Sequence, residues 1–172
     1  MNNADNGTAT ISAFGGSIGG IVGKNGIGGR VAGTNSVAVS SGKNWTIKAN
    51  KTENVQYIGG IVGSSETSEV IEYVDNWAKF DVKEAENANA ITGGIVGYIN
   101  QANTANIRYA RNCEDINGYG ITGGIVGQVN GGGVTFTNCS NHGDITNEYN
   151  AVAGCLRRIF ERKTADDCRS LL

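Results

Sequence analysis

The sequence predicts an all-β fold: a parallel β-solenoid of about five coils, with three short strands per coil and a short C-terminal helix as a cap. Three observations predict it. The motif Gly-Gly-Ile-Val-Gly occurs four times in the 172-residue chain. Short runs of β-branched and aromatic residues, bounded by glycine and asparagine, separate its copies, as is typical of strands and turns. The chain has 27 glycines and no proline, which suits inner strands that hydrogen-bond to both neighbours.

The composition excludes several other classes of protein. Only 17% of the residues are charged and the net charge is -2, so we expect neither a disordered chain nor a nucleic-acid partner. No apolar run reaches the ~18 residues of a membrane-spanning helix, so we expect no membrane insertion. The first residues have neither the basic nor the apolar region of a signal peptide, and none is expected in this chain.

The glycine motif defines the repeat. A repeat of variable length has a fixed structural part and loops that accept insertions, and stacked coils bury the apolar face that one coil alone cannot bury. The tripeptide at 152–154 looks like a fifth, degenerate copy. We therefore assign residues 1–154 to one solenoid domain. The intact copies begin at Gly19, Gly59, Gly93 and Gly123, in steps of 40, 34 and 30 residues.

Between the glycine motifs, an asparagine recurs beside a tryptophan or a cysteine. Equivalent positions of stacked coils form columns, so the asparagines predict an internal amide ladder, with a ligand-binding stripe as the alternative. The next position accepts large and small apolar groups and predicts a core column, as do the isoleucines of the glycine motif. The ladder comprises Asn44, Asn76, Asn112 and Asn138; the core columns comprise Trp45, Trp77, Cys113 and Cys139, and Ile21, Ile61, Ile95 and Ile125.

The valine of the glycine motif is the candidate binding position. Successive side chains of a strand point to opposite faces, so an inward isoleucine places the next valine outward. An exposed apolar stripe of this kind indicates an interaction surface. The alternative is a bulge beside the glycines that turns both side chains inward. The candidate binding residues are Val22, Val62, Val96 and Val126.

Acidic residues cluster between the second and third glycine motifs. Enzymes that cleave polysaccharides on a β-helix place acids and bases on one outer face, so such an enzyme is the alternative function. These acids belong to an insertion rather than to aligned columns, which favours a solvated face without catalytic residues. The cluster comprises Glu66, Glu69, Glu72, Asp75, Asp81, Glu84 and Glu86.

The single histidine and the cysteines indicate no cofactor. His142 has no His or Cys partner at ligand spacing, so we expect neither a metal nor another cofactor. Cys113 and Cys139 fall at equivalent positions of adjacent coils, where they form either a disulfide or two free core thiols. Cys155 and Cys168 flank the tail and are a further pair that could be bonded, but spacing does not determine the pairing.

The composition changes at residue 155. Residues 155–172 contain no glycine and place Leu156, Ile159 and Phe160 at helical spacing among basic residues. We predict an amphipathic helix that caps the open end of the solenoid, since exposed strand edges invite self-association. The alternatives are a tail of different origin and a membrane-binding helix, the latter weakened by Asp166 and Asp167.

The repeated residues resemble a known family. The glycine motif, followed by a strand, Asn-Cys and Gly-Asp-Ile as in residues 138–145, is similar to the GLUG-type repeat of bacterial surface proteins, over roughly residues 11–154. The resemblance implies a non-catalytic, extracellular or cell-surface module that serves adhesion or forms a structural stalk. Its implied partner is a host or matrix protein or glycan bound along its side, with self-association as a further expectation. A pure spacer region of a larger surface protein is the remaining alternative.

Overall fold

The chain folds as a parallel β-solenoid, as predicted. The computed structural model describes residues 7–13, 15–50, 54–66, 70–82, 90–100, 105–131, 133–147 and 153–154. Every strand pairing within this part of the chain is parallel, and each joins strands of neighbouring coils. The described residues complete four coils and enter a fifth, which agrees with the expected number. The predicted helical cap, at 155–172, lies outside the described residues.

The strands lie on four faces, which we label A to D. Face A contains β1 (Ala9–Ala13), β6 (Trp45–Ala49), β10 (Lys79–Asp81), β14 (Ile116–Gly118) and β19 (Ile145–Asn147). Face B contains β2 (Gly16–Gly19), β7 (Gln56–Gly59), β11 (Ala90–Gly93), β15 (Ile121–Gly123) and β20 (Ala153–Gly154). Face C contains β3 (Val22–Asn25), β8 (Val62–Ser65), β12 (Val96–Ile99) and β16 (Val126–Val129). Face D contains β4 (Arg30–Ala32), β5 (Val39–Ser40), β9 (Val70–Asn76), β13 (Asn106–Asn112), β17 (Thr135–Thr137) and β18 (Ser140–Asn141).

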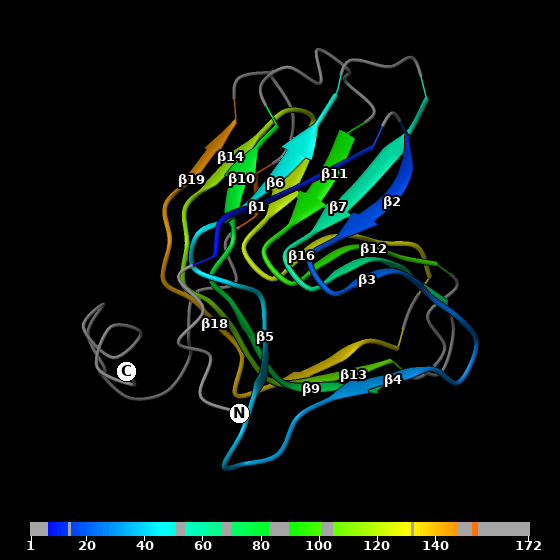
Figure 1. Cartoon of the computed structure of the whole chain (residues 1–172). Helices are drawn as coiled ribbons and strands as arrows, with labels where there is room; N and C mark the ends of the chain where they lie inside the picture. Colours follow the sequence, from blue (N-terminus) through cyan, green and yellow to red (C-terminus); the bar gives the residue numbers. More distant parts are fainter. Residues whose placement is uncertain are drawn as a thin grey trace.

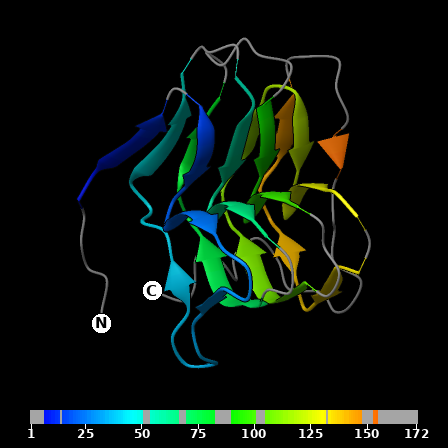
Figure 2. The ribbon, with the colours of Figure 1, turned by 90° about the vertical axis from the view of Figure 1, so that its right-hand side faces the viewer.

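Each complete coil therefore carries strands on four faces, where three strands per coil were predicted. The additional strand arises because the glycine motif is divided between two faces: in the third coil, face B ends at Gly93 and face C begins at Val96. Figure 1 shows the B strands meeting the C strands at an angle, and Figure 2 shows the successive coils side by side, from blue at the left to orange at the right. The motif is a bend between two strands, not part of a single strand.

The glycines of the motif allow three close backbone approaches, which the second coil illustrates. A Cβ on Gly59 would collide with the carbonyl oxygen of the valine in the same motif. One on Gly60 would collide with the backbone of the next coil and with the Asn76 side chain, and one on Gly63 with the backbone of Ile18 in the preceding coil. Each such contact would be closer than 3.0 Å, so the bend requires the absence of a side chain at all three positions.

Two apolar clusters form the described core. One lies between faces A and B and includes Ile47, Ile58 and Phe80. The other lies between faces C and D and includes the isoleucines of the last three glycine motifs. The predicted isoleucine column is confirmed for Ile61, Ile95 and Ile125, which are at most 1% exposed, whereas Ile21 in the first coil is 42% exposed. The first coil has no neighbour on its other side within the described residues, so its isoleucine is only half covered.

A side-chain ladder crosses the molecule between the two clusters. Asn76 Nδ2 donates to Asn112 Oδ1 at 2.7 Å, and Asn112 Nδ2 donates to Asn141 Oδ1 at 2.6 Å. At the other end, the hydroxyl of Ser41 donates to Asn76 Oδ1 at 2.7 Å. The internal ladder is thus confirmed for Asn76 and Asn112, but its end members are Ser41 and Asn141.

The predictions for Asn44 and Asn138 are wrong, because both lie three residues away from the ladder position. Asn44 is exposed in the turn after Ser41, and Asn138 is exposed with a left-handed backbone, φ 53°. The strand register decides between the two asparagines of the fourth coil, since Asn141 pairs with Asn112.

The same register separates the aromatic and cysteine residues. Cys139 lies beside Ala110 in the C/D cluster as a free thiol, whereas Cys113 is disulfide-bonded. Cys113 and Cys139 are therefore neither bonded to each other nor both free, so neither alternative considered for this pair holds. The predicted Trp and Cys column is also wrong, because Trp45 begins β6 on face A while Trp77 follows β9 on face D.

Candidate functional site

The four candidate valines do not form an exposed stripe. Val62 and Val96 are 0% exposed, and Val22 and Val126 are partly buried against the C/D cluster. The bend turns the isoleucine and the valine of the motif inward together, which is the alternative considered for the sequence. These valines are core residues, and the basis for assigning them a binding role is lost.

The acidic residues of face D form ion pairs between coils. Glu72, 6% exposed, lies on β9 between Arg30 of the preceding coil and Arg108 of the following coil, with Arg108 Nη2 at 2.8 Å from its Oε2. Asp75 accepts from Nε and Nη2 of Arg111 at 2.7 and 2.5 Å. Bidentate pairs of this kind hold both partners in a defined geometry. These contacts favour the structural interpretation of the acids.

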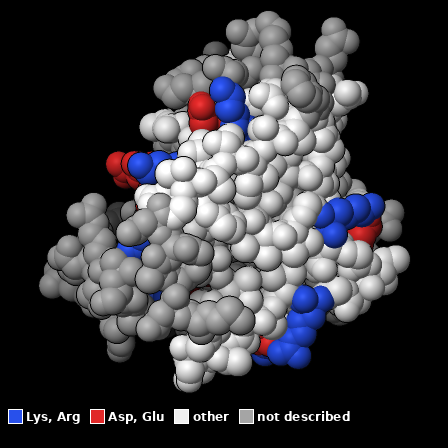
Figure 3. All heavy atoms as spheres, in the orientation of Figure 1, with Lys and Arg blue, Asp and Glu red and all other residues white. Residues whose placement is uncertain are grey.

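The two other described acids of the predicted cluster also lie near cations. Asp81 Oδ2 lies 4.0 Å from Lys48 Nζ, and Glu66 Oε1 lies 2.8 Å from Lys24 Nζ. Glu69, Glu84 and Glu86 lie outside the described residues. Figure 3 shows acids and cations adjacent to each other near the edge of the visible face, whose middle carries no charge.

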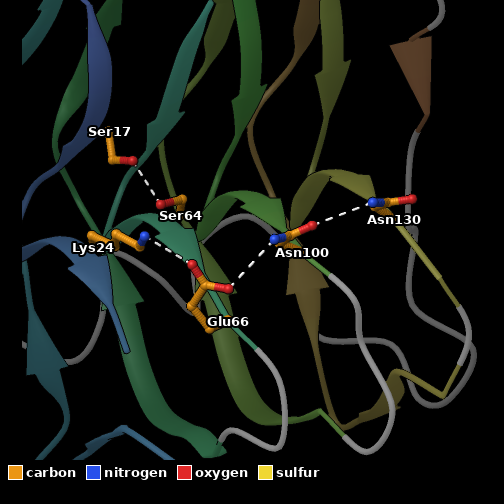
Figure 4. Close-up of polar contacts among 6 residues, drawn as sticks. All are labelled: Ser17, Lys24, Ser64, Glu66, Asn100 and Asn130. Carbon is orange, nitrogen blue, oxygen red and sulfur yellow. Dashed lines mark hydrogen bonds and ion pairs between the residues drawn. The ribbon is translucent and has the colours of Figure 1, made fainter. Parts of the chain in front are cut away.

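Glu66 begins a polar row along the end of face C. The hydrogen bond from Lys24 lowers the pKa of the Glu66 carboxyl, which therefore stays ionised and is unsuited to act as a general acid at neutral pH. Asn100 Nδ2 donates to Glu66 Oε2 at 3.4 Å, and Asn130 Nδ2 donates to Asn100 Oδ1 at 3.3 Å. Figure 4 shows this row running from coil to coil along the solenoid.

Faces B and C enclose an outer corner beside that row. One residue of each of the first four B strands and one of each C strand line it. The B residue points away from the core, because Ile18 and Ile58 next to it point inward and side chains alternate along a strand. The C residue meets it in two coils, through Ser64 and Tyr98. We define the outer corner by four residues of face B, Ser17, Tyr57, Ile91 and Ile121, and four of face C, Lys24, Ser64, Tyr98 and Gln128.

Side chains meet across this corner. Tyr57 and Tyr98 stack with their ring centroids 4.4 Å apart and their planes 13° from parallel. The hydroxyls of Ser17 and Ser64 are hydrogen-bonded at 2.6 Å, as Figure 4 shows. Both pairs join a B strand to the C strand of the following coil, so the corner is a continuous surface along the axis.

A second tyrosine pair lies on face D. Tyr73 and Tyr109 stack at 4.6 Å with planes 5° from parallel, and both have a left-handed backbone, φ 51°. Asn138 occupies the same column with φ 53°. Tyr109 is 41% exposed and is flanked along β13 by the arginines that bind Glu72 and Asp75.

The corner tyrosines were not among the candidate residues chosen from the sequence. A positional signal marks them: the corner residues stand two places before the first glycine of each motif and two places after its valine. Their variety, from serine to tyrosine to isoleucine, conceals the repeat that the glycines display.

No metal or membrane site emerges from the described part of the chain. No group of three or more His, Cys, Asp or Glu side chains there could hold a metal ion, and no helix there is long and apolar enough to span a bilayer. His142 Nε2 is hydrogen-bonded to the Ser140 hydroxyl at 2.9 Å.

Comparison with known proteins identifies no relative. No protein-family model, no curated protein and no solved structure matches this chain.

Proposed function

We propose that the chain is a non-catalytic repeat module of an extracellular or cell-surface protein, which forms a stalk and binds a host or matrix protein or glycan along its side. The observation that carries this proposal is the use of the outer-face acids as links between coils. Glu72 and Asp75 each bind arginines of a neighbouring coil, so these carboxylates stiffen the stack instead of standing beside a vacant catalytic position.

The resemblance to GLUG-type repeats supports the same proposal and is the source of the proposed location. A β-helix enzyme that cleaves polysaccharide is the competing function. It would require an acid and a base that converge on substrate, and the described acids of face D are held by guanidinium groups instead. A spacer without any ligand is the third possibility.

The experiment compares binding with cleavage on the whole chain. The purified protein is incubated with matrix proteins, mucins and polysaccharides, and each mixture is assayed for saturable binding and for shortening of the polymer. We expect binding without shortening, and unfolded protein serves as the control for non-specific adsorption. Shortening of a polysaccharide would contradict the proposal in favour of an enzyme, and absence of any binding would favour a spacer.

A further inference from the structure

Stacking with Tyr98 uses only one of the two ring faces of Tyr57. Tyr98 belongs to the coil after that of Tyr57, so its ring covers the face of Tyr57 that is turned toward the C-terminal coils. The other face of Tyr57 is turned toward the first coil. On that side the register partner of Tyr57 is Ser17, whose hydroxyl is hydrogen-bonded to that of Ser64, and both side chains are smaller than a tyrosine ring.

Hydrogen-bonding groups occupy the neighbouring positions of the corner. Ser17 and Ser64, whose hydroxyls are paired, are the register partners of Tyr57 and Tyr98 in the preceding coils. Figure 4 shows the Lys24–Glu66 pair farther along face C. The side chain of Lys24 is 64% exposed. An aromatic face bordered by a few fixed donors and acceptors suits a flat ligand with an apolar face and polar edges.

The charge of the corner indicates a neutral ligand. Lys24 is the only charged residue among the eight that define the corner, and its ammonium is bonded to Glu66. The side chains of the remaining seven are hydroxyl, amide, aromatic or aliphatic. The charge of an anionic polymer would add little binding free energy here, since the polymer would compete with Glu66 for the ammonium of Lys24.

The backbone geometry argues against an extended peptide. The corner is bounded by the faces of two sheets, whose strands are paired on both sides in the middle coils. Peptides that bind by strand addition need an unpaired sheet edge. The corner presents side chains and no unpaired strand edge in these coils, and a sugar ring binds to side chains of this kind.

We infer that the outer corner binds a neutral glycan, with one sugar ring stacked on the free face of Tyr57 and its hydroxyls bonded to Ser17 and Ser64. This inference rests on the proposed function and names the ligand class and the site. Successive coils repeat the corner at about 4.8 Å intervals, so the glycan lies along the axis and extends past the tyrosine stack.

The chain itself supplies matched variants for the test. Tyr57→Ser copies Ser17, which occupies the same column one coil earlier. Tyr109→Asn is the control, because it removes a stacked tyrosine from face D and copies Asn138 of the next coil. Urea unfolding of both variants establishes that each is folded. Ser17→Tyr is a second test, since it places another ring at the register position next to Tyr57 without removing Tyr57.

The probes are a soluble glucan, a xylan and a mannan, with polygalacturonate as the charged counterpart. We expect at least one neutral polysaccharide to bind the unaltered chain, with little change between low and high salt. Tyr57→Ser and Ser17→Tyr should each weaken that binding about tenfold or more, equivalent to about 1.4 kcal/mol, while Tyr109→Asn leaves it unchanged.

Several results would overturn the inference. These are failure to bind any neutral polysaccharide, binding of polygalacturonate alone with a steep salt dependence, and binding that Tyr57→Ser leaves intact or that Tyr109→Asn weakens equally. Retained binding of a matrix protein in these cases would preserve the proposed function while removing the glycan site. Polysaccharide shortening would instead overturn the proposed function itself.

Discussion

At the scale of single residues, the side chains of this solenoid are selected by contacts between coils more than by contacts within them. The second glycine of each motif illustrates this, because the atoms that exclude a methyl group at Gly60 belong to Gly94 and Asn76. The ladder asparagines depend on their neighbours in the same way, since each buried amide is satisfied by the next coil. Loss of one such residue leaves its partners in the adjacent coil without a contact or a hydrogen bond.

Replacement of Gly60 by alanine should destabilise the fold. The added methyl group would press on the backbone of the next coil, and neither that backbone nor the buried Asn76 can move away freely. We expect a loss of about 2 kcal/mol or more in the free energy of unfolding, measured in urea. Gly26→Ala is the control, because a Cβ there meets no atom within 4 Å, and we expect a change below about 1 kcal/mol. Equal midpoints for the two variants would contradict the proposed close approach.

The buried thiol of Cys139 should make stability fall at alkaline pH. Burial raises the pKa of this thiol above its ordinary value of 9.0, so the native chain holds the proton more tightly than the unfolded chain. The resulting stability is present below pH 9.0 and is lost as the pH rises through the higher native value. Cys139→Ala, which copies Ala110 of the same column, should show a shallower decline above that pH in unfolding free energy. Parallel pH profiles for the two proteins would refute this assignment.

At the scale of elements, the strands are short because each one ends where the solenoid turns, and the turns have different causes. The B and C strands are separated by glycines whose missing side chains let backbones approach. Face D changes direction instead at a left-handed residue, Tyr73 in β9 and Tyr109 in β13. On that face, adjacent strands are held together by the arginine–carboxylate pairs as well as by the backbone ladder.

The ion pairs of β9 should contribute measurably to stability. Glu72→Gln leaves two guanidinium groups without their carboxylate, and we expect a loss of about 1 to 2 kcal/mol, reduced by the partial exposure of both arginines. Asp81→Asn is the control, because its nearest ammonium is 4.0 Å away, and the loss should stay below about 0.5 kcal/mol. Urea unfolding at low and high salt measures both effects. A smaller loss for Glu72→Gln than for Asp81→Asn would argue against the structural role.

At the scale of the whole molecule, the solenoid is a row of similar coils and its stability is a sum over neighbours. Each described coil contacts only the coil before it and the coil after it through its strand pairs. Figure 2 shows this one-dimensional order. Both apolar clusters continue from coil to coil, so removing an inner coil should shorten the core without opening it.

Deletion of residues 77–112 should give a folded, shorter solenoid. The deletion joins Asn76 to the residue after Asn112, and these two asparagines are register partners. We expect a retained β-type circular dichroism spectrum and a urea m-value lower by about a quarter, since one coil less surface is exposed on unfolding. Deletion of residues 60–95 has the same length but joins Gly59 directly to Val96. The remaining bend then lacks its second glycine and its isoleucine, and this control should not fold. An unfolded product of the first deletion would contradict the nearest-neighbour description.

Much of the fold was predictable because stacking repeats residues at a readable interval. The glycine motif recurs where each coil turns, and its isoleucine recurs because each coil buries one there, so the parallel stack and the Ile61–Ile95–Ile125 column follow from repetition. The ladder was predictable at Asn76 and Asn112 for the same reason. The ladder prediction was wrong in the fourth coil, because the Asn-Cys dipeptide used to align the coils stands three residues before the ladder position there. Ile116 pairs with Ile145, and Asn112 and Asn141 each stand four residues before one of these isoleucines. An alignment of the two isoleucines would therefore have identified Asn141 from the sequence.

The candidate site was less predictable, because it depends on the direction in which side chains point at the bend and not on which residues recur. The recurrence of residues was sufficient to predict parallel, stacked coils with glycines at the turns, since each coil must bury the apolar side chains of the next. The repeat does not reveal that the bend turns isoleucine and valine inward together and closes faces B and C into a corner. The physical reason is that the bend angle is set by backbones of neighbouring coils approaching where glycine leaves no Cβ, a contact between residues such as Gly63 and Ile18. That angle brings Tyr57 to Tyr98 across 41 residues of chain.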